Sequence, residues 1–466
     1  MDTAVKDVQK NPLGYEKVGS LLRKYAIPCI IAMLVSALYN IVDQIFIGQG
    51  VGVLGNAATN VAFPLSTVCV ATALLFGTGC AAKYSLELGA GRREGASEVV
   101  GNAMGFLAIT GVIIAVLVEA FLQPLMLAFG ATQDVLGYAM TYTRITAIGI
   151  PFLIFANGTS NIIRADGSPR YSMGFMVAGA VLNTILDPLL MFGFGMGIAG
   201  AAIATTFSQI VSCACALWYT TRFKNIRLNR SDFKLKFVNL KEISALGASA
   251  CFNQLAMLAV QITMNNVLTY YGARSPYGSE IPLACAGIII KVGMIFLSIV
   301  IGIAQGSQPI IGFNYGAKQY DRVRETYKLA ILSASVVSVA SFLCFQIFPR
   351  QIISIFGTGS EVYFEFAERY FRIFMFGTLV NSVQPVTGNF FTAIGKPAKG
   401  IFISMTRQII FLLPLILLLP MVFGINGIMY AGPIADFAAF AVAMIMVLGE
   451  MRRMRRMSDT LENAIE

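Results

Sequence analysis

The sequence predicts an all-α polytopic membrane protein with twelve transmembrane helices in two pseudo-symmetric six-helix bundles. Composition is the first observation: 56% of the residues are hydrophobic, 12% are charged, and mean hydropathy is +0.72. Soluble domains carry about 25% charged residues. Apolar runs of at least 18 residues recur along the chain, and each is long enough to cross a hydrocarbon core of about 30 Å. The third observation is an internal repeat.

Three short motifs return at half the chain length. Residues 79–90 (GCAAKYSLELGA) and 306–317 (GSQPIIGFNYGA) share two glycines and an alanine at an offset of 227. The segment ADGSP at 165–169 returns as AIGKP at 393–397, and a Gly-Ile-x-Gly turn at 197–200 returns at 424–427. Three matches in register indicate a duplication. Duplicated halves in an apolar chain are typical of transporters whose site lies between two similar bundles.

The long, continuous apolar runs favour helices, because a β-barrel would show segments of about ten residues with alternating polarity. Clusters of glycine, proline and charge end each run. The twelve predicted spans are 24–47, 57–82, 100–127, 136–160, 172–193, 200–221, 242–270, 283–309, 328–348, 363–391, 400–420 and 427–450. Residues 1–23, before the first span, are mostly polar.

The distribution of positive charge predicts the topology. The formal net charge is +10, which in a soluble protein could indicate nucleic-acid binding. Here lysine and arginine collect in the N-terminus, the even-numbered loops and the C-terminus, while the odd-numbered loops contain Arg274 and Arg350. The positive-inside rule then places both termini in the cytoplasm. We expect the chain to lie in the plasma membrane and to have no nucleic-acid partner.

Each half contains six spans, so the two halves should share one orientation across the membrane. We expect an N-terminal lobe at 1–221, a basic cytoplasmic linker at 222–241, and a C-terminal lobe with a short cytoplasmic tail at 242–466. The linker contains seven basic residues, which suits a topology anchor.

Histidine is absent, and the eight cysteines all fall in predicted spans without a CxxC pair. The absence of histidine removes His-based general-base catalysis, His metal sites and a His switch. We therefore expect no enzyme, no cofactor and no metal site beyond a possible Na⁺. Carboxylates remain as the proton carriers.

Charged groups within a membrane span are expensive, at about 2.5–3.5 kcal/mol each, and are functional candidates by default. Asp43 and Asp187 lie well inside the first and fifth spans. Asn183 precedes Asp187 by four residues, which places both on one helical face. The other polar side chains of this half that we single out are Tyr39, Asn157 and Thr205. Hard oxygen donors suit a small alkali cation, and a carboxylate pair also suits a proton.

The second half has no counterpart to these acids. At the repeat offset Asp187 corresponds to Pro414 or Leu415, so the ion site is expected in the first bundle. The acids could instead pair with a basic group inside a span, such as Arg144, Lys291 or Arg407. For Lys291 and Arg407 a role in the substrate pathway is an alternative to ion pairing or snorkelling.

Several of these motifs resemble the multidrug and toxic compound extrusion (MATE) family. The matching pieces are DQIFIG at 43–48, GAG at 89–91, IRADGSP at 163–169, and LNTILDP at 182–188 running to GIAGAA at 197–202. The Asn-x-x-x-Asp-Pro run is the most specific. Arg407, together with Asn157 and residues 164–167, looks most like the MepA-like branch.

The resemblance implies two six-helix lobes that open alternately to either side of the membrane in a monomer. It implies export of amphiphilic, often cationic drugs in exchange for Na⁺ or H⁺, an activity associated with antibiotic resistance. The family's ion-coupling site falls on Asp43, Asn183, Asp187 and Thr205, and its pocket network on Tyr39 and Asn157. In our mechanism a cationic drug uses the same two carboxylates as the ion.

Other functions stay open at this point. A flippase for a lipid-linked oligosaccharide would need a more cationic cavity and often additional helices. An integral membrane enzyme would need a catalytic constellation, and a receptor or scaffold would not need paired acids at membrane depth.

Overall fold

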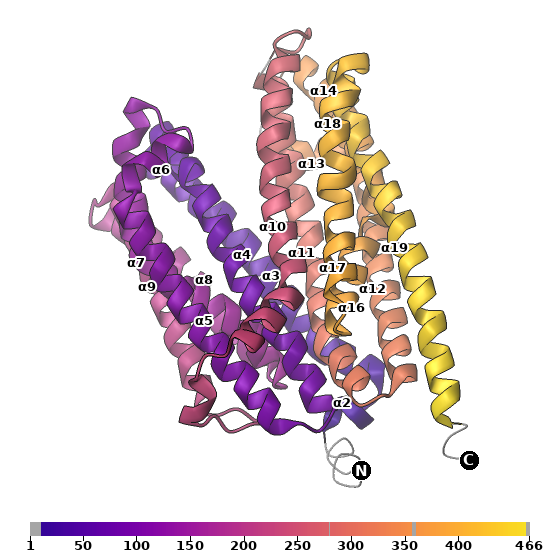
Figure 1. Ribbon diagram of the computed structural model, residues 1–466. Helices are drawn as coiled ribbons and strands as arrows, with labels where there is room; N and C mark the ends of the chain where they lie inside the picture. Colours follow the sequence, from indigo (N-terminus) through magenta and orange to yellow (C-terminus); the bar gives the residue numbers. More distant parts are fainter. Residues whose placement is uncertain (1–10, 279, 357–359, 463–466) are drawn as a thin grey trace.

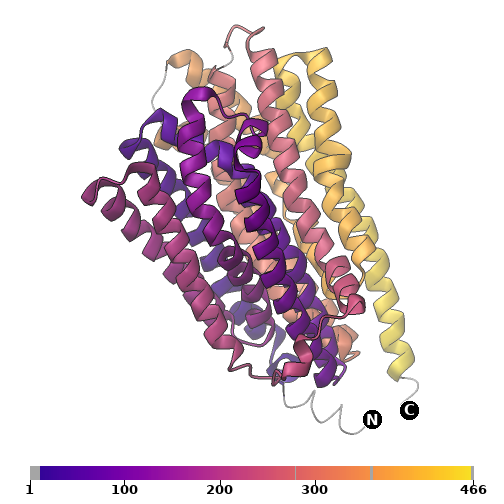
Figure 2. The ribbon, with the colours of Figure 1, turned by 60° about the vertical axis from the view of Figure 1, so that its left-hand side comes forward.

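The computed structural model describes residues 11–278, 280–356 and 360–462. Every regular element within these ranges is helical. The helices form two bundles, and both chain termini lie at the same end of the molecule, which is called the terminal end below (Figures 1 and 2). The prediction of an all-α polytopic membrane protein is confirmed.

The first bundle contains six long helices and three short helical segments. These are α2 (Pro12–Tyr15), α3 (Val18–Gly50), α4 (Val53–Gly89), α5 (Arg93–Ala120), α6 (Leu122–Ala128), α7 (Gln133–Ala165), α8 (Pro169–Pro188), the π-helix η1 (Leu189–Gly193) and α9 (Gly197–Thr220). The 3₁₀-helix η2 (Arg230–Phe233) lies in the connection to the second bundle.

The second bundle is less regular. Its segments are α10 (Phe237–Gly272), α11 (Glu280–Gly316), α12 (Tyr320–Ile347), α13 (Pro349–Phe356), α14 (Glu361–Phe374), η3 (Met375–Gly377), α15 (Thr378–Asn381), α16 (Val383–Ala393), α17 (Pro397–Met405), the π-helix η4 (Thr406–Leu412), α18 (Leu413–Phe423) and α19 (Ile425–Glu462). Eleven continuous helical stretches in the described ranges are long and apolar enough to cross a membrane. The predicted span 363–391 instead consists of four consecutive segments, α14 to α16.

The repeated motifs are turns of matching geometry. Gly167 and Gly395 follow α7 and α16 with φ of 91° and 74°, a left-handed conformation that favours glycine. A proline then begins the next helix in each half, α8 and α17. The third motif behaves likewise, since Gly197 and Gly424 have φ of 56° and 57°.

The first repeated motif, at 79–90 and 306–317, forms part of the contact between the two bundles. A side chain on Gly89, at the end of α4, would overlap the carbonyl oxygen of Phe313 on α11. Conversely, a side chain on Gly316 would overlap the carbonyl oxygen of Leu86 on α4. Residues 86 and 313 are themselves separated by 227 positions. The interface therefore repeats its own contact across a pseudo-twofold axis, and glycine allows the backbones to approach closely.

Polar contacts join the bundles at the terminal end. Lys83 of α4 reaches Glu242 of α10 (2.9 Å), and Arg322 of α12 donates to the carbonyl oxygens of Leu13 (3.0 Å) and Glu16 (2.7 Å). Towards the opposite end the ribbons of α4 and α10 diverge (Figure 1).

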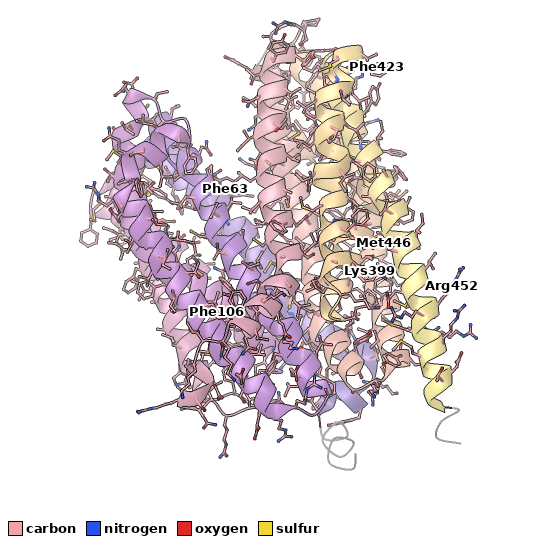
Figure 3. The ribbon with its side chains drawn as sticks, in the orientation of Figure 1. Phe63, Phe106, Lys399, Phe423, Met446 and Arg452 are labelled. Atoms are coloured by element: carbon pink, nitrogen blue, oxygen red, sulfur yellow. The ribbon has the colours of Figure 1, made fainter. Side chains whose placement is uncertain are left out.

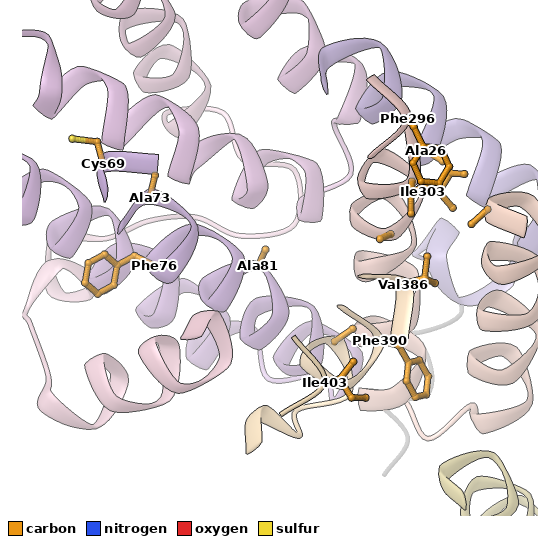
Figure 4. Packing of buried hydrophobic residues seen from close by; sticks show 14 of the residues in the cluster. Ala26, Cys69, Ala73, Phe76, Ala81, Phe296, Ile303, Val386, Phe390 and Ile403 are labelled. Carbon is orange, nitrogen blue, oxygen red and sulfur yellow. The ribbon is translucent and has the colours of Figure 1, made fainter. Parts of the chain in front are cut away.

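Apolar side chains fill the interior where the bundles touch. Ala26 of α3 and Phe296 and Ile303 of α11 are all buried and belong to one apolar cluster (Figure 4). Within the second bundle, Phe390 of α16 lies near Ile403 of α17.

The close approach at Gly89 generates a prediction. Gly89→Ala should lower the free energy of unfolding by about 1–3 kcal/mol, because the new methyl group overlaps the Phe313 carbonyl. Thermal unfolding of the purified protein in detergent measures this loss. Gly174→Ala is the matched control: nothing lies within 4 Å of that position in α8, so its stability should stay the same or rise. Equal melting temperatures for both variants would contradict the predicted packing constraint.

Candidate functional site

The site lies within the first bundle, where α3, α7, α8 and α9 each contribute side chains. Asn183 and Asp187 lie one turn apart on α8 and are both buried, with Asp187 fully so. Pro188 ends α8 immediately after Asp187, and the chain continues as the π-helix η1. π-Helical turns of this kind often occur at functional sites.

The Asn183 amide connects the Asp187 carboxylate to α9. With the amide oriented to satisfy both of its ends, Nδ2 donates to Asp187 Oδ2 (3.2 Å). Its Oδ1 then accepts from the backbone nitrogen and the hydroxyl of Thr205, each at 3.2 Å. The sequence spacing thus correctly placed Asn183 and Asp187 on one face, and Thr205 lies opposite them.

Asp43 of α3 completes the cluster, because its carboxyl group is close enough to interact electrostatically with that of Asp187. Two neighbouring carboxyl groups in an apolar interior are not both ionised unless a cation lies between them. One oxygen of Asp43, Oδ1, is buried without a hydrogen-bond partner among the described residues. An unpaired buried acceptor beside a second carboxylate is suited to a proton or a small cation.

Two tyrosines border the acids. Tyr39, one turn before Asp43 on α3, is close enough to interact electrostatically with both Asp43 and Asp187. Tyr142 of α7 is close enough to interact electrostatically with the same two acids. Tyr142 was not among the residues predicted from the sequence. The available signal was its position in the polar run Thr141-Tyr142-Thr143-Arg144 inside the fourth predicted span.

Asn157 lies elsewhere on α7 and makes local contacts. Its Nδ2 donates to the Leu153 carbonyl (3.0 Å), and its own carbonyl accepts from Asn161 (3.0 Å). Asn161 in turn accepts a hydrogen bond from Arg164, which also donates to Gln305 of α11 (3.0 Å). Among the described residues, no hydrogen bond joins Asn157 to the acids. Asn157 instead belongs to a chain of polar side chains that reaches the second bundle.

The two basic pathway candidates differ. Arg407, in η4, forms an ion pair with the buried Asp436 of α19 (2.5 Å), so ion pairing, one of the two roles considered for it, is present. Lys291 lies half-buried on α11, and the described residues offer it no ion pair or hydrogen bond. No group of three or more His, Cys, Asp or Glu side chains within the described ranges could hold a metal ion.

Comparisons with known proteins agree with this architecture. The MatE family model matches residues 28–189 and 250–418, one segment in each half. The multidrug export protein MepA of Staphylococcus aureus (strain MSSA476) is 26% identical over 464 residues, covering 98% of this chain and 99% of that protein.

Solved structures show the same fold. A MATE structure in complex with MaD3S superposes with a TM-score of 0.88 at 23% identity, covering 96% of this chain and 98% of that chain. An outward-facing multidrug resistance transporter of the MATE family also has a TM-score of 0.88 at 23% identity, covering 97% and 99%.

The Arg407–Asp436 pair should be essential to stability. Arg407→Gln leaves a buried carboxylate without its cation, and we expect the free energy of unfolding to fall by about 3–5 kcal/mol. Arg407→Gln combined with Asp436→Asn should recover most of this loss, because no charge then remains buried. Thermal unfolding of the two variants beside the parent protein measures both effects. If the single and double variants unfold at the same temperature, the pair does not stabilise the bundle in this way.

Proposed function

Because the chain belongs to the MatE family, we propose that it exports amphiphilic, often cationic compounds in exchange for Na⁺ or H⁺. One observation carries this proposal: the cluster in which the buried Asp187 and Asn183 meet the half-buried Asp43 and Thr205. Two acids in contact within an apolar bundle need an external cation for neutrality. The multidrug export activity of the MepA relative supports the substrate class.

The proposed ion site uses oxygen atoms from three helices. Asp43 Oδ1 is the acceptor without a partner, and Asp187, Asn183 and Thr205 supply the remaining oxygens. Carboxylate, amide and hydroxyl oxygens suit Na⁺. A proton would satisfy the same acids by bridging the two carboxyl groups. Both ions therefore remain candidates for coupling.

The proposed mechanism couples this site to the position of α3. Binding of the inward-moving ion neutralises Asp43 and Asp187, and α3 bends or repacks against α8. Pro28 removes one internal hydrogen bond of α3 and thereby lowers the cost of bending. A cationic drug that uses the same carboxylates is then displaced and released. The ion must bind one conformation more tightly than the other, because equal affinities shift no equilibrium.

The drug-binding region is proposed to include Tyr39, Asn157, Asp43 and Asp187. The two tyrosines beside the acids supply aromatic faces, which attract organic cations. We propose that Lys291 of the second bundle lies along the substrate pathway. We further propose a plasma-membrane location with cytoplasmic termini, since the basic linker and the terminal arginines share one end of the molecule (Figure 1). We also propose that the protein is a monomer, because a single chain contains all the residues of the proposed site.

Efflux from proteoliposomes tests the proposal. A fluorescent lipophilic cation should leave the vesicles under an imposed Na⁺ or H⁺ gradient with the parent protein, and the gradient that drives efflux identifies the coupling ion. Asp187→Asn should reduce the driven rate by at least about a hundredfold, because the neutral amide cannot exchange one charge for another. Asp134→Asn, the same chemical change at an exposed position of α7, is the matched control.

Two outcomes would redirect the proposal. Driven efflux by Asp187→Asn at the parent rate would contradict the ion site. No movement under either gradient would contradict cation export, and lipid-linked oligosaccharides would then be the substrates to test.

Thr205→Val distinguishes the two coupling ions by a different route. This substitution preserves the side-chain shape and removes one oxygen ligand. If Na⁺ is the coupling ion, the Na⁺ concentration for half-maximal efflux should rise about tenfold, as expected for the loss of one interaction of about 1.4 kcal/mol. If H⁺ is the coupling ion, the dependence on the proton gradient should change little. Initial efflux rates over a series of gradients measure both quantities.

A further inference from the structure

An open recess, called the cavity below, lies far from the acids, at the terminal end of the second bundle. It has a volume of about 530 Å³ and lies between the connection from α11 to α12 and the last turns of α19. Its polar lining includes Lys318, Arg452, Arg453 and Arg456. In Figure 3, Arg452 lies on the lower part of α19, below Met446, and its side chain points away from the bundle. The proposed transport mechanism makes no use of this cavity.

The cavity is strongly basic. None of its lining residues is acidic. The nearby acids already have cationic partners: Glu450 pairs with Lys396 and with Lys399 (2.9 Å), and Asp321 pairs with Arg324 (2.9 Å). Among the side chains that the structure describes, none forms an ion pair with the four basic residues of the cavity. All four side chains are exposed, so an anion can reach them from outside and would offset the repulsion between their like charges.

The backbone at Lys318 points to the same conclusion. Lys318 has φ of 60°, the left-handed conformation, and is the sole non-glycine residue with positive φ in the described ranges. Its repeat counterpart, Gly91, has φ of 76°, and glycine adopts this conformation without strain. The second half thus has a strained lysine where the first half has an unstrained glycine, and the lysine faces the cavity.

The arginines are also specific to the second half. At the repeat offset of 227, the positions of Arg452, Arg453 and Arg456 correspond to Asn225, Ile226 and Asn229. The first-half helix α9 ends at Thr220, whereas α19 continues to Glu462. The extension of α19 beyond the repeat therefore supplies the cationic wall of the cavity, which has no equivalent in the first bundle.

The cavity lies at the border between apolar and charged surface. The apolar stretch of α19 ends near Gly449, and the run MRRMRRM follows Glu450 at 451–457. Gly449 itself faces open space, with nothing within 4 Å, and Met457 and Tyr320 add apolar lining. A basic recess at this level matches an anionic phospholipid, whose headgroup carries a net negative charge and whose acyl chains lie in the adjacent hydrocarbon.

We propose that this cavity binds the phosphate of an anionic phospholipid from the leaflet at the terminal end. Lys318, Arg453 and Arg456 contact the phosphate, Arg452 adds positive charge at the rim, and the surface near Gly449 accommodates the start of the acyl chains. A free phosphate ion shares the headgroup chemistry but lacks the acyl chains. The proposal requires that the chain spans a membrane and does not depend on the transported substrate.

Native mass spectrometry of the full chain in detergent tests the proposal, with phosphatidylglycerol, phosphatidylcholine or inorganic phosphate added in separate titrations. The parent protein should bind phosphatidylglycerol more tightly than phosphatidylcholine. Arg453→Gln and Lys318→Gly should each weaken phosphatidylglycerol binding about fivefold, the loss expected for one basic residue near an anionic headgroup.

Controls separate binding from charge and folding. Arg455→Gln removes the same charge from the same helix outside the cavity lining, and should bind as the parent does. Lys318→Gly relieves the backbone strain, so its melting temperature should not fall. Gly449→Met fills the recess without a change of charge and should also weaken binding.

Three results would overturn the proposal. One is equal binding of phosphatidylglycerol by Arg453→Gln, Lys318→Gly and the parent. Another is an equal loss in Arg455→Gln, which would indicate a diffuse charge effect. The third is inorganic phosphate binding as tightly as phosphatidylglycerol, which would assign the cavity to a free anion.

Discussion

The contact between Asp43 and Asp187 constrains the rest of the structure. Two carboxyl groups that share an apolar interior cannot both be ionised without a cation between them. Asp43 belongs to α3 and Asp187 to α8, so the protonation or ion occupancy of this pair bears directly on how these two helices pack. Asn183 extends the constraint to α9 through Thr205, and Tyr142 extends it to α7. A charge added or removed at this pair therefore changes the side-chain interactions of four helices of the first bundle.

A change in helix packing at this cluster can move one part of the protein only if another part stays fixed. Hydrogen bonds and close backbone contacts hold the terminal end together. Asp166 is fully buried there and accepts hydrogen bonds from Tyr84 (2.6 Å), Tyr219 (2.8 Å) and the backbone nitrogens of Lys224 and Asn225. This single carboxylate ties the connection between the bundles to α4 and α9. The reciprocal glycine contacts at Gly89 and Gly316 fix the bundles against each other nearby. The proposed alternating access would then move the opposite end, where α4 and α10 diverge (Figure 1).

Much of this arrangement could be predicted from the sequence, because period and repeat are local properties of the chain. The four-residue spacing fixed one face for Asn183 and Asp187, and the repeated motifs marked turns that recur with similar φ. Long-range partners were harder to predict. Tyr142 joins the site through packing of α7 against its neighbours, and the pairing of Arg407 with Asp436 joins segments 29 residues apart. The break in the tenth span was also missed, since its apolar composition does not reveal where the backbone leaves α-helical geometry near Ser382.

The difference between the two bundles follows from charge neutrality. In the second bundle a buried acid, Asp436, has an internal cation in Arg407. That pair is complete, and an ion from solution has nothing to neutralise there. In the first bundle two acids contact each other, and one oxygen of Asp43 lacks a partner among the described residues. The duplication preserved the turns and the interface glycines, while the position of Asp187 became Pro414 or Leu415. The second bundle thus neutralises its buried Asp436 internally, whereas the first brings two acids together with no ion pair among the described residues. The proposed ion coupling rests on this asymmetry.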